Sequence, residues 1–230
     1  MINFYAPTIG LATILGFALG ALVYFHKPQT ITKIRWALFS CAASSWNLGY
    51  FISLISPNHA VSIVASRVSH ACGALSPITY LHFVLVLLGL EKKRKRFLFW
   101  AYVYSFALLF FSLTPLVVKD VVPKQGIRFY PEWGPLYIAY ALTYLALMGY
   151  TWVLMIKAMK RYVGVEQLRI IYLFISSLIG FAGGMSLFLL IFNREISPYG
   201  SILIVLYPPI MVYSIIQHQL MDIEVIVKRT

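Results

Sequence analysis

The sequence is poor in charged residues, and acidic ones are the scarcest. Only 11% of its 230 residues are charged, 60% are hydrophobic, and 7 Asp and Glu stand against 19 Lys and Arg. In a typical soluble domain about a quarter of the residues are charged. A soluble globular domain is therefore excluded, and the composition is that of an integral membrane protein.

Cysteine is almost absent. Cys41 and Cys72 both lie within apolar stretches and form no CxxC pair. Such a pattern indicates neither a disulfide framework nor a metal site. We interpret both as small apolar packing residues and predict no metal and no cofactor.

Residues that several kinds of membrane chemistry require are also missing. Residues 170–217 contain no lysine, which excludes a retinal Schiff base, and neither an intramembrane aspartate nor HExxH is present. Ser76 and His82 are six residues apart on one predicted helix and turn away from each other, so no proteolytic dyad is predicted. Transporters and pumps commonly use an acid or base near the membrane midplane, whereas Asp and Glu here fall only in connections and the tail. We predict no catalytic residue.

Apolar stretches of about twenty residues recur along the chain, and this length crosses a hydrocarbon core about 30 Å thick. Seven are predicted, at 5–25, 34–55, 63–90, 97–118, 136–156, 170–192 and 199–217. The first has no basic segment before it and no small-residue cleavage site after it, so we predict a retained helix and not a signal peptide. The expected fold is an all-α membrane protein, a seven-transmembrane-helix bundle.

The basic residues gather in alternate connections. Fourteen of the 19 cations lie there and in the tail: Lys27, Lys33, Arg35, Lys92, Lys93, Arg94, Lys95, Arg96, Lys157, Lys160, Arg161, Arg169, Lys228 and Arg229. The positive-inside rule then predicts an external amino terminus and a cytoplasmic carboxyl terminus, with some affinity for anionic lipid. The cations are not interleaved with base-stacking aromatics, so no nucleic-acid partner is predicted.

The second predicted span places Trp46, Asn47 and Tyr50 close together. Trp46 and Tyr50 are four residues apart and share a helix face, with Asn47 beside them. A side-chain amide is costly in lipid, so Asn47 is expected to face the bundle interior. Two roles fit it: a hydrogen bond between helices, or a place in a ligand pocket.

The third predicted span is the most polar of the seven. Arg67 and His70 lie one turn apart near its outer end, and Pro77 and His82 follow. An ionisable group at membrane depth is a functional candidate by default. The alternatives are that Arg67 reaches the outer interface, and that both histidines are neutral structural residues and not pH sensors.

Residues 119–135 form the longest predicted external connection, rich in proline, glycine and aromatics. We predict no regular structure there, and such a loop often serves as a lid or binding element. Phe129, Tyr130 and Trp133 either line the mouth of a pocket or anchor at the lipid headgroups.

We predict a ligand pocket in the outer half of the bundle, between the second and third spans and under this connection. Its candidate residues are Trp46, Asn47, Tyr50, Arg67, His70, His82, Tyr130 and Trp133.

Several residues carry a resemblance to a known family. They are Trp36, Ser45, Trp46 and Tyr50 in the second span, Pro77, His82 and Phe83 in the third, and Pro208, Tyr213, Ile215, His218, Leu220, Asp222, Ile223 and residues 227–230 at the end. Together with seven spans and the outside-in topology, they make the whole chain resemble the seven-helix amino-terminal region of bacterial sensor histidine kinases.

The resemblance implies a sensor of the bacterial cytoplasmic membrane that passes a conformational change through its last helix to a kinase or other output domain. The sequence holds no HExxxP phosphoacceptor box and no DxGxG lid, so we predict no enzymatic activity in these residues. Residues 1–217 would form the sensor domain and 218–230 a cytoplasmic transmission segment.

The predicted mechanism is a shift between two packings of the bundle, caused by a small or lipophilic signal or by a state of the membrane. Pro208 and Pro209 would loosen the last helix as a hinge, and His218 and Asp222 would belong to the coupling segment. The expected partners are the lipid bilayer, an output domain in cis or in trans, an unidentified small ligand and a second copy in a homodimer. The alternative function is a small-solute transporter or channel.

Overall fold

The computed structural model describes residues 5–192, 200 and 202–218, with side chains as far as Met211. Its elements are α1 (Tyr5–Phe25), α2 (Ile31–Ile55), α3 (His59–Leu87), the short 3-10 helix η1 (Lys92–Arg94), α4 (Lys95–Ser112), β1 (Val118–Lys124), β2 (Ile127–Trp133), α5 (Tyr137–Arg161), α6 (Val165–Phe192) and α7 (Leu203–His218).

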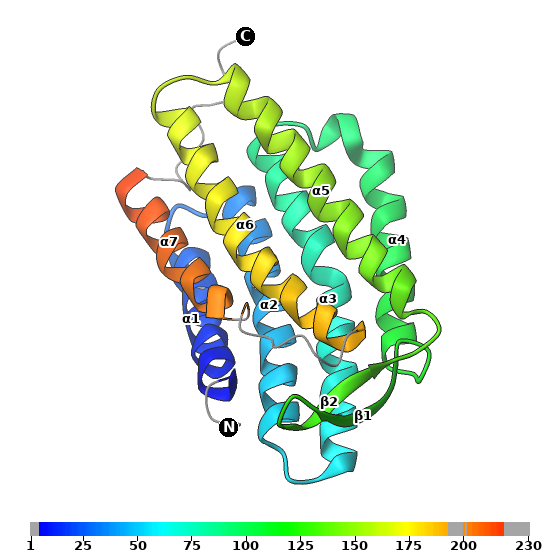
Figure 1. The fold of residues 1–230 in the computed structure, drawn as a ribbon. Coiled ribbons are helices and arrows are strands. Elements are labelled where there is room, and N and C mark those ends of the chain that lie inside the picture. Colours follow the sequence, from blue (N-terminus) through cyan, green and yellow to red (C-terminus); the bar gives the residue numbers. More distant parts are fainter. Residues whose placement is uncertain (1–4, 193–199, 201, 219–230) are drawn as a thin grey trace.

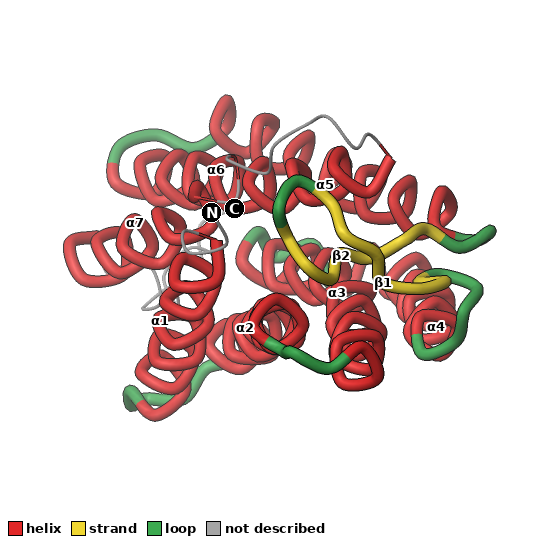
Figure 2. Tube along the Cα trace, turned by 60° about the horizontal axis from the view of Figure 1, so that its bottom comes forward, coloured by secondary structure: helices red, strands yellow, loops and turns green. Residues whose placement is uncertain are grey.

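The helices run side by side in two rows (Figures 1 and 2). One row holds α1, α2, α3 and α4, and the other holds α7, α6 and α5. The rows meet where α1 contacts α7 and where α3 contacts α5. Helix α3 is the most enclosed, since 83% of its most apolar 18 residues are buried, against 33% for α1.

The outer faces of the helices are apolar. On α4, for example, Trp100 is 63% exposed and Phe110 is 65% exposed. Five helices in the described part of the chain are long and apolar enough to cross a bilayer, namely α1, α2, α3, α5 and α6. Together with the apolar faces, these helices make the chain a multi-pass, all-α membrane protein.

Local caps set the starts of two helices earlier than predicted. The Thr30 hydroxyl accepts a 3.3 Å hydrogen bond from the Lys33 amide, so α2 begins at Ile31 and not at residue 34. The Asn58 side chain accepts a 2.8 Å bond from the Ala60 amide and starts α3 at His59. Thr and Asn side chains at this position satisfy amides that have no partner inside the helix.

Two predictions about residues 97–135 are wrong. The helix predicted to reach residue 118 ends at Ser112, because Pro115 disfavours helical backbone in the residue before it. The connection predicted to lack regular structure is an antiparallel hairpin in which Val122 pairs with Tyr130 and Lys124 with Ile127.

A tight turn makes this hairpin possible. Gln125 and Gly126 both have positive φ angles, 49° and 75°, which a two-residue hairpin turn requires and which matches the twist of the strands. The hairpin lies across the end of the bundle, over α3 and near α5 and α6 (Figure 2). It therefore closes the end opposite the basic 91–96 connection (Figure 1).

Candidate functional site

A cavity of about 50 Å³ lies at mid-depth in the bundle. It is lined by Ala12, Gly16 and Leu19 of α1; Phe39, Ser40, Ala43, Ser44, Trp46 and Asn47 of α2; Ser76 of α3; Tyr144 of α5; Gly180 and Phe181 of α6; and Ile204, Tyr207 and Pro208 of α7. Each water needs roughly 10 to 15 Å³ of such space, so the cavity has room for about four waters or an organic molecule of similar size.

Small residues bring the helices together around this space. A Cβ atom at Gly16 would lie 2.3 Å from the Ser44 hydroxyl, and one at Gly180 would lie 3.0 Å from the Tyr207 ring. Glycine at these positions lets α1 approach α2 and α6 approach α7 closely.

Three polar side chains on the wall have no hydrogen-bond partner in the described part of the chain. They are Asn47, Ser44 and Ser76, and all three residues are buried. The Tyr144 and Tyr207 hydroxyls also lack a partner there, but they are closed off from the cavity, and the Tyr144 oxygen lies against Gly184. Unpaired polar groups are costly in an apolar interior, so the cavity suits an occupant that forms hydrogen bonds.

The rest of the wall is aromatic and apolar. The Trp46 ring lies 6.3 Å from the Tyr144 ring, and the Phe39 and Phe181 rings stack 6.0 Å apart, centroid to centroid. None of the lining residues is ionisable at neutral pH. An apolar wall with a few convergent hydrogen-bonding groups is the usual design of a small-molecule site.

Of the predicted ligand residues, the structure brings Trp46 and Asn47 to this cavity. Sequence reasoning missed Ser44, Tyr144 and Tyr207, which lie on three different helices. The small-residue run before Trp46 was the signal for Ser44. Nothing in the sequence places α5 and α7 opposite α2, so Tyr144 and Tyr207 could not be assigned.

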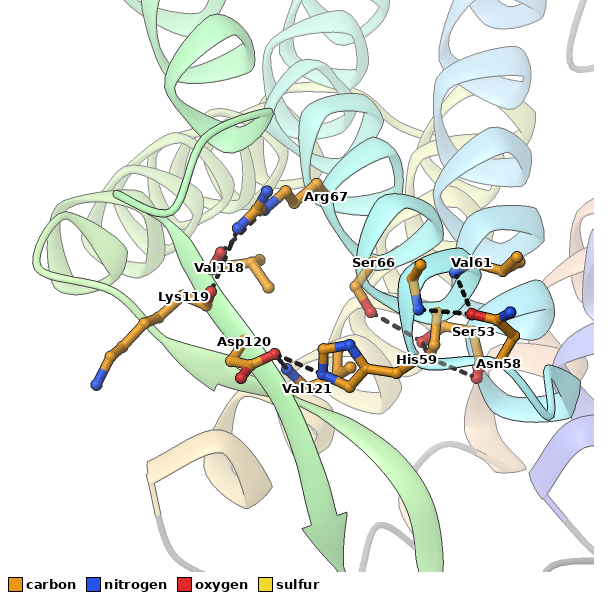
Figure 3. Close-up of polar contacts among 12 residues, drawn as sticks. Ser53, Asn58, His59, Val61, Ser66, Arg67, Val118, Lys119, Asp120 and Val121 are labelled. Atoms are coloured by element: carbon orange, nitrogen blue, oxygen red, sulfur yellow. Dashed lines mark hydrogen bonds and ion pairs between the residues drawn. The ribbon is translucent and has the colours of Figure 1, made fainter.

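Arg67 lies elsewhere, at the hairpin. Its Nε and Nη2 atoms donate hydrogen bonds of 3.2 and 3.3 Å to the carbonyl oxygens of Val118 and Lys119 (Figure 3). Nearby, the His59 ring nitrogen Nε2 lies 2.8 Å from the Asp120 carboxylate. Both contacts attach the first strand to α3, so Arg67 holds the hairpin on the bundle.

His70 is buried next to tyrosines. Its Nδ1 donates a 2.8 Å hydrogen bond to the Ser66 carbonyl one turn earlier. Its ring lies 5.7 Å from the Tyr137 ring and 5.6 Å from the Tyr140 ring. This is the environment of a histidine that packs inside the bundle, and it is separate from the cavity.

Tyr50 and Tyr130 meet edge to face, with ring centroids 5.9 Å apart. Tyr130 of β2 is wholly buried between the hairpin and the bundle. Burial raises the pKa of its hydroxyl, so the hydroxyl stays protonated and acts as a donor. It is therefore not an anchor at the headgroups. Trp133 is 46% exposed and packs against Phe192.

His82 lies near the opposite end of α3. Its two ring nitrogens are each 2.9 Å from a partner, the Tyr102 hydroxyl and the Glu91 carboxylate. Arg35 lies 3.7 Å from the same carboxylate. Twelve helical residues, about 18 Å of rise, separate His82 from His70, so the two histidines belong to different clusters.

The predicted coupling residues divide between described and undescribed parts. Pro208 and Pro209 both lie inside α7, and Pro208 is on the cavity wall while Pro209 is exposed. His218 is the last residue of α7, and its side chain lies outside the described part; Asp222 lies outside the described residues. Among the described residues, no three His, Cys, Asp or Glu side chains gather as a metal site would require.

One known protein family matches most of the chain. The model of the N-terminal 7TM region of histidine kinase matches residues 8–224. The chain belongs to this family. No curated protein and no solved structure matches it. This family is a membrane sensory region of histidine kinases and not their catalytic domain. A seven-helix membrane region also agrees with the apolar outer faces of the helices.

Proposed function

We propose that the chain is the membrane-embedded sensory input module of a bacterial signal-transduction protein. It detects a small or lipophilic signal, or a state of the membrane, and passes a conformational change through α7 to a cytoplasmic effector such as a histidine kinase. The family match supports the sensory role. The single observation that carries the mechanism is that α7 forms part of the cavity wall through Ile204, Tyr207 and Pro208.

This contact gives an occupant of the cavity direct access to the helix that leads to the transmission segment. A ligand shifts a two-state equilibrium only by its different affinity for the two states. An occupant that contacts both α2 and α7 binds the two states with different affinities if α7 moves between them. In this proposal Trp46 and Asn47 contact the signal, Pro208 and Pro209 form the hinge, and His218 and Asp222 belong to the coupling segment.

The remaining elements of the proposal concern topology and partners. The basic connections support seven spans, an external amino terminus and a cytoplasmic carboxyl terminus in the bacterial inner membrane. Residues 1–217 act as the sensor and 218–230 as the transmission segment. The output domain acts in cis or in trans, and a homodimer is the expected signalling unit.

The test joins the chain through Thr230 to the catalytic region of a bacterial histidine kinase and measures phosphorylation of its response regulator in membranes. We expect Asn47→Leu to change the basal output several-fold, because it removes an amide from the cavity wall. Cys41→Leu is the matched control, since it lies on the exposed face of the same helix.

An output that is equal in wild type, Asn47→Leu and Cys41→Leu would contradict control by the cavity. Proteoliposomes that contain the purified chain test the alternative. Specific flux of small solutes would favour a transporter or channel and would count against the sensory role.

A further inference from the structure

We propose that the mid-bundle cavity is a binding site for a small neutral amphiphile, a molecule with a short apolar body and one amide or hydroxyl group. For its biological role the inference rests on the proposed sensory function. The binding itself depends only on the geometry of the wall.

The hydrogen-bonding capacity of the wall sets the polar half of the ligand. An amide can both donate and accept hydrogen bonds, so Asn47 matches another amide or a hydroxyl. Ser44 and Ser76 line the same space, and their hydroxyls find no hydrogen-bond partner in the described part of the chain. A polar ligand would satisfy groups that the protein leaves without partners in the described part of the chain, and this gives the site its specificity.

The absence of charge on the wall sets the net charge of the ligand. The lining residues include no Asp, Glu, Lys, Arg or His. An ion moved from water into such a site would lose its hydration and gain no counter-charge. The ligand is therefore neutral, which also lets it enter from the lipid phase.

The volume sets its size. About 50 Å³ of free space holds roughly four to five heavy atoms by comparison with water. The aromatic wall of Phe39, Trp46 and Phe181 accommodates a chain of two or three carbons. Propionamide has this size and combination of groups, and 1-propanol is its hydroxyl counterpart.

The experiment titrates propionamide into the full chain in lipid nanodiscs and follows saturation-transfer NMR signals of the ligand. We expect saturable binding of propionamide and 1-propanol, and none of propionate, propylammonium or the larger benzamide. Equal signals from propionate or benzamide would overturn the ligand class. A wild-type chain with no saturable propionamide signal would show a cavity filled by water only and would overturn the site.

Two variants place the site. Asn47→Leu, of similar volume, is expected to weaken propionamide binding about tenfold or more, because it removes the polar partner. Ser76→Ala is a milder change that keeps the fold if Asn47→Leu does not, and it is expected to weaken binding about threefold. The exposed control Cys41→Leu should bind as wild type does. Unchanged binding in Ser76→Ala and in a folded Asn47→Leu would overturn the assignment.

The experiments distinguish failure of the proposed ligand site from failure of the proposed sensory function. Propionamide binding without any effect on kinase output would leave the site standing and contradict the sensory mechanism. Output that responds to Asn47→Leu in a chain that binds none of the neutral probes would contradict the ligand class and leave the sensory role standing.

Discussion

The Tyr130 hydroxyl of β2 donates a 2.7 Å hydrogen bond to the Leu187 carbonyl of α6. Close by, the Lys124 ammonium donates a 2.8 Å bond to the Ile191 carbonyl, one of the carbonyls at the helix end that lack an intrahelical partner. Arg67 holds the same hairpin on α3. The hairpin therefore joins α3 to the end of α6.

Tyr130→Phe is expected to loosen the hairpin from α6. The substitution keeps the buried ring and removes one hydrogen bond, which costs about 1 kcal/mol of folding free energy. Hydrogen exchange should rise in residues 127–133, and thermal unfolding should shift to a lower temperature. Tyr24→Phe is the control because the Tyr24 side chain is 43% exposed. Equal exchange in wild type and Tyr130→Phe would contradict this role.

Arg67→Ala is expected to free the start of β1. Two bonds from one guanidinium to the Val118 and Lys119 carbonyls are lost, and a charged hydrogen bond contributes about 1.5 kcal/mol or more. Limited proteolysis within residues 118–124 should become about tenfold faster. Arg128→Ala on the same hairpin removes an exposed cation and is expected to leave the rate unchanged. If both variants are cleaved alike, charge and not the tie to α3 explains the effect.

Gly49→Ala is expected to push α2 away from α3. A Cβ atom at this position would lie 2.9 Å from the Ala65 carbonyl oxygen and 3.0 Å from the Ser69 Cα atom. Backbone atoms cannot rotate away, so we expect a loss of about 1 to 3 kcal/mol, as for other overpacked contacts. The comparison is Gly149→Ala in α5.

A Cβ at Gly149 meets nothing within 4 Å. Alanine there is expected to stabilise the helix by up to about 1 kcal/mol because of its higher helix propensity. Unfolding followed in detergent micelles compares the two variants. Similar stabilities would show that α2 and α3 tolerate a wider separation.

These relationships explain what the sequence could predict. Hydrophobic runs of membrane length located the helices, because any helix in lipid must satisfy its own backbone and expose apolar side chains. The span 5–25 is confirmed as α1, and the interior position expected for Asn47 is confirmed by its burial. Helix ends were less certain, since they depend on single capping residues such as Thr30 and Asn58.

The candidate site could be predicted only in part. Asn47 was found because a side-chain amide is costly in lipid, and Trp46 was found because it adjoins Asn47 on the same helix. Tyr144 and Tyr207 look like any other aromatic residue until the two rows of helices are placed opposite each other. Arg67 was predicted to face a ligand because its partners are backbone carbonyls, which carry no sequence signal.

Pro208→Ala tests α7 as the moving element of the proposed sensor. Pro208 lacks an amide and disturbs the helix at the Ile204 carbonyl four residues before it; alanine restores that hydrogen bond and stiffens α7 beside the cavity. We expect a folded protein whose kinase fusion responds several-fold less to a bound ligand, measured by regulator phosphorylation. Leu206→Ala controls for substitution in α7 as such, because the Leu206 side chain lies on the exposed face of this helix. A full response in Pro208→Ala would show that α7 transmits the signal without a hinge at this position.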